Sequence, residues 1–103
     1  MSIHFFVRFE PLPGKAAEFR EELLRVVEAA RKESGCISIR AFESIREPFT
    51  FAIHSDWVDE PAFDLHARLP HTRRFLEAAE KLLTRDAEGI RTREIGGGAA
   101  ALP

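Results

Sequence analysis

The chain has 103 residues, the length of a single domain, and its 45% hydrophobic and 31% charged residues are typical of a soluble globular protein. Its formal net charge of −2 argues against a nucleic-acid or membrane partner, because such general binding needs a basic excess. The sequence has no apolar run near the ~20 residues that span a bilayer, no signal-peptide pattern and a single cysteine, so we expect a cytoplasmic protein without disulfides.

The first half of the chain shows one helix pattern among three strand patterns. Residues 3–10 carry apolar side chains at alternate positions, which predicts a strand with one strongly apolar face. Residues 15–33 carry them at helical spacing and predict the longest helix, with Gly35 as a left-handed residue after its end. Residues 36–43 and 49–57 alternate again, and the short polar connection between them predicts an antiparallel pair.

Two helical segments follow the third strand. Asp59 is a good N-cap and Pro61 suits a first helical turn, so a short helix is expected over residues 60–69. Pro70 should end that helix. A second helical piece is expected over residues 72–84, where apolar side chains again form one stripe.

The complete order predicts one α+β domain over residues 1–95. A charged strand at 90–95 would close a β-α-β-β-α-β series, which is the ferredoxin-like arrangement with its helices on one face of an antiparallel sheet. Phe6 and Ala52 point to the other face, and burying them predicts a homodimer through sheet-on-sheet packing. Residues 96–103 are Gly- and Ala-rich and predict a flexible tail.

Short motifs recur in a fixed order along the chain. They are Pro13-Gly14-Lys15, Gly35-Cys36, Trp57, Ala62-Phe63-Asp64-Leu65-His66 and Pro70-His71. Together they resemble the antibiotic biosynthesis monooxygenase family of small dimeric α/β-barrel proteins, over roughly residues 3 to 95. The resemblance implies a pocket between sheet and helices. It also implies oxygenation of an aromatic or quinol substrate by O₂ without metal or flavin.

Departures from the family pattern narrow the chemistry. Related haem-degrading proteins use Asn, Trp and His at positions where this chain has Val7, His66 and Leu76, so haem degradation is not expected. Many family members have Glu two residues before the strand-three Trp, where Ser55 stands here, and an aromatic residue where Thr72 stands. The resemblance therefore transfers the fold and the pocket more directly than it transfers a set of catalytic residues.

Three functions are compatible with these patterns. The first is a cofactor-independent monooxygenase acting on a quinol or an aromatic polyketide-like molecule. The second is a non-catalytic dimeric barrel that binds a small molecule or serves a stress response. The third is an isomerase or lyase in which His66 moves a proton between two positions of its substrate.

His66 is the candidate catalytic residue. It lies within the apolar stripe of its helix and so should face the sheet. An imidazole with an ordinary pKa near 6.5 suits proton transfer at neutral pH, so His66 is a candidate general base. The alternative is a buried histidine that is satisfied by a backbone carbonyl.

Six further residues are candidates for binding the substrate. His71 and Arg74, near the start of the last helix, could hold an anion, or they belong to a solvated basic patch. Trp57 could stack on a flat substrate, although core packing is the simpler role. The apolar residues of the first and third strands are pocket walls or simply core. These are Phe5, Val7 and Phe51.

Metal and cofactor chemistry are not expected. His4 and His54 could meet across adjacent strands, but no acidic or cysteine motif accompanies them. Cys36 stands among apolar residues, where a lone cysteine is more often an inert small side chain than a nucleophile.

Overall fold

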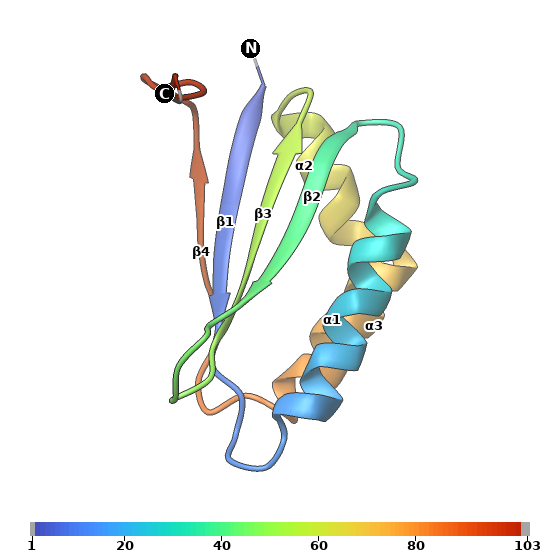
Figure 1. The fold of residues 1–103 in the computed structure, drawn as a ribbon. Coiled ribbons are helices and arrows are strands. Elements are labelled where there is room, and N and C mark those ends of the chain that lie inside the picture. Colours follow the sequence, from blue (N-terminus) through green and yellow to red (C-terminus); the bar gives the residue numbers. More distant parts are fainter. Residues whose placement is uncertain (1, 102–103) are drawn as a thin grey trace.

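The computed structural model describes residues 2–101, which form four strands and three helices. Their bounds are β1 Ile3–Phe9, α1 Ala16–Ala30, β2 Cys36–Glu43, β3 Phe51–Trp57, α2 Glu60–Arg68, α3 Pro70–Glu80 and β4 Glu88–Thr92. The strands form one antiparallel sheet in the order β2-β3-β1-β4, and the helices cover one of its faces (Figure 1). The predicted ferredoxin-like α+β fold is confirmed. No helix within residues 2–101 is long and apolar enough to cross a membrane.

Element boundaries differ from the predicted ones at the end of the chain. Pro70 ends α2 as expected, but it also begins α3, because proline is favoured at the first helical position. β4 begins at Glu88 rather than at residue 90, and Glu88 pairs with Arg8 of β1. The partner strand, more than the apolar pattern, decides where this edge strand starts.

The core lies between the sheet and the helices and is built from aromatic rings. Phe9 and Phe51 of the sheet meet Phe19 of α1 at ring-centroid distances of 5.1 Å and 5.3 Å. Phe75 of α3 completes the cluster with an edge contact to Phe9. Offset and edge-on rings of this kind are the favoured aromatic packing. The predicted inward faces of β1 and β3 are confirmed by this cluster.

Gly35 serves a different purpose from the one predicted. It is not among the glycines with positive φ, so the prediction of a left-handed residue was wrong. A Cβ atom on Gly35 would lie 2.5 Å from Cβ of Ala62 in α2. The missing side chain therefore allows the segment after α1 to pass directly against α2, which places Glu33 beside that helix.

Within residues 2–101, no helix covers the second face of the sheet (Figure 1). Phe6, Phe42 and Ile90 are exposed there, and the ring of Phe6 stacks on His54 at 4.5 Å. The predicted tail forms no strand or helix over residues 96–101. Its last two residues, and Met1 at the start of the predicted domain, lie outside the described part.

Candidate active site

Helix α2 places His66 beneath the sheet. The helix begins at a cap in which Asp59 Oδ1 accepts a hydrogen bond of 2.9 Å from the Ala62 N–H, as the sequence predicts. Phe63 and His66 lie one turn apart, so both side chains face inward. The His66 ring packs against Trp57 at a centroid distance of 4.5 Å and against Phe63 at 5.7 Å.

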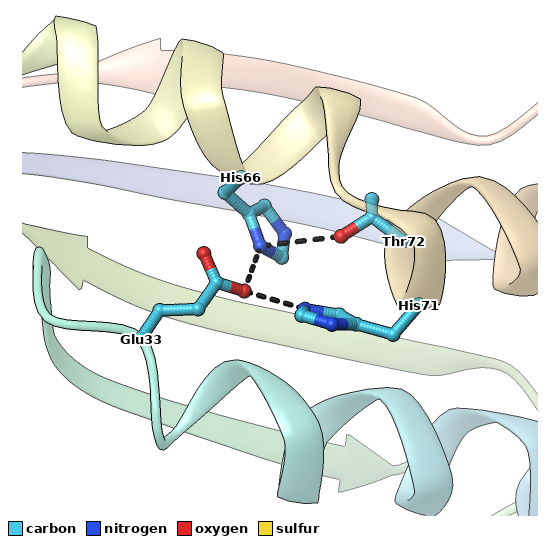
Figure 2. A network of polar contacts seen from close by, with 4 residues as sticks. All are labelled: Glu33, His66, His71 and Thr72. Carbon is cyan, nitrogen blue, oxygen red and sulfur yellow. Dashed lines mark hydrogen bonds and ion pairs between the residues drawn. The ribbon is translucent and has the colours of Figure 1, made fainter.

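A carboxylate links His66 to a second histidine. Glu33 Oε2 lies 2.7 Å from His66 Nδ1 and 2.6 Å from His71 Nε2 (Figure 2). Glu33 stands in the turn after α1, where its N–H bonds to the Ala30 carbonyl and its own carbonyl accepts from the Cys36 N–H. The two imidazoles come from α2 and from the first turn of α3. Three separate segments thus meet at one oxygen atom.

This contact determines the tautomer of His66. An ionised carboxylate only accepts hydrogen bonds, so the Glu33-facing nitrogens of both rings carry the protons. Burial lowers the pKa of His66 from its ordinary value, and this effect exceeds the opposing influence of Glu33. The neutral ring therefore has a free lone pair on Nε2, which makes no hydrogen bond to another residue within 2–101. Such a nitrogen can accept a proton from a molecule beside it.

His66 forms part of the wall of a cavity between the sheet and helices α2 and α3. The cavity has a volume of about 270 Å³, and its lining is apolar except for Ser55, His66 and Thr72. Among the residues that the structure describes, no charged side chain lines it. A cavity of this size and lining suits a small, flat and uncharged molecule with one or two hydroxyl or carbonyl groups.

The cavity brings together some of the predicted site residues. Phe5 and Val7 of β1 line it together with His66. Phe51 and Trp57 do not line it: Phe51 packs in the aromatic core, and Trp57 is 0% exposed behind the His66 ring. Trp57 therefore supports the site from behind, in agreement with the packing role that the sequence favours.

His71 and Arg74 lie outside this cavity. They line a separate pocket between α1 and α3, together with Arg25 and Glu22. His71 nevertheless reaches the site through Glu33, because it contacts the same Oε2 atom as His66 (Figure 2). The structure thus brings His71 to the site as a neighbour of Glu33, while Arg74 stays at the surface pocket.

Glu33 is the functional candidate that the sequence did not single out. It ends a charged stretch of the predicted helix, where an acidic residue usually faces solvent. Its partners are 33 and 38 residues away along the chain, so no local spacing reveals the contact. The only local signal is its place directly before the Ser34-Gly35-Cys36 turn.

Comparison with known sequences finds one matching family model and one curated relative. The family model described as antibiotic biosynthesis monooxygenase matches residues 2–78. An uncharacterised protein of Synechocystis is 33% identical over 76 residues, which make up 74% of this chain. These residues are 52% of that protein, so the chain spans about half the length of this relative.

Solved structures share the fold at low sequence identity. A Mycobacterium tuberculosis protein is 22% identical with a TM-score of 0.88, over 96% of this chain and 100% of that chain. A Pseudomonas aeruginosa protein is 22% identical with a TM-score of 0.85, over 92% and 95%. A structure named antibiotic biosynthesis monooxygenase is 18% identical with a TM-score of 0.85, over 91% and 99%. At these identities the likeness concerns the fold alone.

Proposed function

Because the chain belongs to the antibiotic biosynthesis monooxygenase family, we propose that it oxygenates a small aromatic or quinol molecule with O₂ in the cavity beside His66. The observation that carries this proposal is the Glu33–His66 contact at the wall of an otherwise apolar cavity. It combines a proton acceptor, a negatively charged partner and a largely apolar space. These are the features that formation and oxidation of a phenolate require.

His66 acts as the general base in this proposal. The substrate hydroxyl gives its proton to Nε2, and the resulting imidazolium is stabilised by the Glu33 carboxylate at Nδ1. Thr72 Oγ1 lies 3.3 Å from the same Nδ1 and helps to hold the ring. A general base of this kind accounts for about 10²- to 10⁴-fold in rate.

The substrate itself supplies the electrons. Its anion gives an electron to O₂, and the two radicals combine to form a peroxide at a ring carbon. Loss of water turns that carbon into a carbonyl, so that a hydroquinone and O₂ become a hydroxyquinone and H₂O. No external reductant is needed. The apolar walls keep water from the intermediate.

Oxygen consumption with one- and two-ring hydroquinones tests this proposal. Wild-type protein should take up O₂, form a quinone absorbance and place one oxygen atom of labelled O₂ in the product. His66→Ala should lower turnover by about 10²-fold or more, because the proton acceptor is lost. His54→Ala is a matched control, since His54 lies on the opposite face of the sheet.

Three outcomes would change the assignment. Turnover that is unaffected by His66→Ala would remove the proposed role of this residue. If no hydroquinone is consumed but one binds saturably in the cavity, the non-catalytic binding function is supported instead. Conversion without O₂ uptake would favour an isomerase or lyase.

We further propose that the uncovered sheet face packs against a second copy of the chain. Phe6 is 46% exposed and Ile90 62% exposed on this face, and they line a hollow with Phe42, Ala52 and His54. An exposed apolar surface on a sheet is stabilised when it is buried against another sheet. Such a contact joins the two protomers face to face and leaves each cavity on the outer, helix-covered side.

Phe6→Glu is expected to convert the protein to a monomer, because the dimer would bury an unpaired carboxylate. Light scattering at micromolar concentration measures the mass of wild type and variant. Leu65→Glu serves as control, since Leu65 is 52% exposed on α2, away from the open sheet face. A monomeric wild type would contradict the proposal.

A further inference from the structure

The Glu33 cluster contains three groups that commonly bind metal ions. Glu33, His66 and His71 each offer one ligand atom, and these atoms lie within 4.8 Å of one another. Two imidazole nitrogens and one carboxylate oxygen form a donor set used by Zn²⁺ and other divalent first-row metals. Magnesium and calcium prefer all-oxygen sites and fit this set poorly.

We propose that Glu33, His66 and His71 bind one divalent transition-metal ion, with Zn²⁺ as the reference case. The ion would lie among His66 Nδ1, His71 Nε2 and a Glu33 oxygen, at bonds of about 2.0–2.2 Å, with water completing the coordination. Each imidazole can present a lone pair to the ion by moving its proton to its other ring nitrogen. The two hydrogen bonds at Glu33 are then exchanged for three coordinate bonds.

The charge balance around Glu33 favours a cation. Its side chain is only 11% exposed, and within residues 2–101 its ion-pair partners are the two histidines alone. No lysine or arginine neutralises it among the described residues. A divalent ion would supply positive charge to this largely buried carboxylate, and buried charges are stabilised by pairing or by metal coordination.

A metal ion could reach the cluster from solvent, and the ligand atoms need only small shifts to bind it. The separations of 2.7 Å and 2.6 Å at Glu33 Oε2 must open to about 3.3 Å for ligands at tetrahedral angles. His71 has the more accessible side chain, which is 32% exposed in the first turn of α3, while that of His66 is 12% exposed. Entry from the His71 side leads to the pocket between α1 and α3 and does not pass through the cavity.

Metal at this site would change the chemistry of His66. With Nδ1 bound to the ion, the ring proton moves to Nε2, so the nitrogen can donate to a molecule in the cavity but cannot take its proton. Zinc is therefore expected to inhibit the oxygenation. This consequence rests on the proposed function, whereas the binding itself does not.

A second histidine pair must be removed before binding is measured. His4 Nδ1 and His54 Nε2 lie 2.8 Å apart on the uncovered sheet face. Asp56 Oδ1 lies 3.8 Å from Nε2 of His4, which is not the nitrogen that faces His54. The pair therefore presents two ligands, both histidine nitrogens, to one ion. The variant His54→Ala removes the pair and leaves the Glu33 cluster intact.

Calorimetric titration with zinc chloride tests the site, using chelator-treated, untagged protein in the His54→Ala background. One ion per chain should bind, and adding Glu33→Gln or His71→Gln should weaken that binding at least tenfold. Thermal unfolding checks that each variant is folded. If a variant is not folded, NMR of the His54→Ala protein replaces the affinity comparison for that variant. The ring signals of His66 and His71 should then shift together as zinc is added.

The proposal is overturned if the His54→Ala protein binds no zinc, if Glu33→Gln binds it unchanged, or if the two ring signals do not respond. Failure of the proposed function looks different, because zinc would then bind one per chain to a protein that consumes no O₂. Conversely, the protein could consume O₂ at a rate that zinc does not change and bind no zinc stoichiometrically. That result would reject the metal site and leave the proposed oxygenation intact.

Discussion

Replacing Glu33 with Gln is expected to lower O₂ consumption by about a hundredfold or more while the protein stays folded. The carboxylate accepts hydrogen bonds from both His66 and His71. The amide oxygen of glutamine has two lone pairs and can still accept from both rings, but it is neutral and therefore a weaker acceptor than the carboxylate. It also cannot stabilise an imidazolium by charge. Loss of the carboxylate that orients the histidine of a Ser-His-Asp triad costs about 10⁴-fold in kcat.

Glu28→Gln is the matched control for this experiment. Glu28 lies on α1 and pairs at 2.9 Å with Arg31 on the exposed surface, away from the cavity. The same chemical change there should leave turnover within about twofold, because exposed ion pairs contribute little. Steady-state O₂ uptake, normalised to the folded fraction, compares both variants. Equal rates for Glu33→Gln and wild type would show that Glu33 only fills space.

Trp57→Ala is expected to cause the largest loss of stability. The side chain is 0% exposed and packs against Phe63 and His66. Removing a buried aromatic ring costs about 3–5 kcal/mol in free energy of unfolding, and each kcal/mol lowers Tm by about 4–8 °C in a domain of this size. Circular dichroism must follow the unfolding, since Trp57 is the sole tryptophan of the chain.

Trp57→Phe separates packing from substrate contact. Phenylalanine keeps most of the apolar volume and removes Nε1, a buried N–H that has no partner within the described residues. Trp57→Phe should therefore lower the free energy of unfolding clearly less than Trp57→Ala does. Because Trp57 does not line the cavity, we expect KM to change less than twofold. A large rise in KM at unchanged stability would return Trp57 to the role of substrate-stacking residue.

The helices and strands of this protein follow from local patterns. Alternation along β1 separates Phe5, Val7 and Phe9 from Phe6, and the structure places these two sets on opposite faces of the sheet. Boundaries were predicted less well, because pairing decides them: β4 begins at Glu88, opposite Arg8. Gly35 illustrates a further limit, since its role is a close approach to Ala62 that no local pattern describes.

By itself, the sequence determined the fold, the family resemblance and the inward direction of His66, since all three depend on periodicity and on motifs in a fixed order. Only the tertiary structure decided what His66 touches. Glu33 and His71 reach it across 33 and 5 positions of the chain, because the turn at Gly35 packs against α2 and because α3 starts at Pro70. A carboxylate shared by two imidazoles is a product of that packing. For this reason His66 could be singled out from the sequence as a candidate proton acceptor, whereas its partner and the candidate metal site could not be predicted.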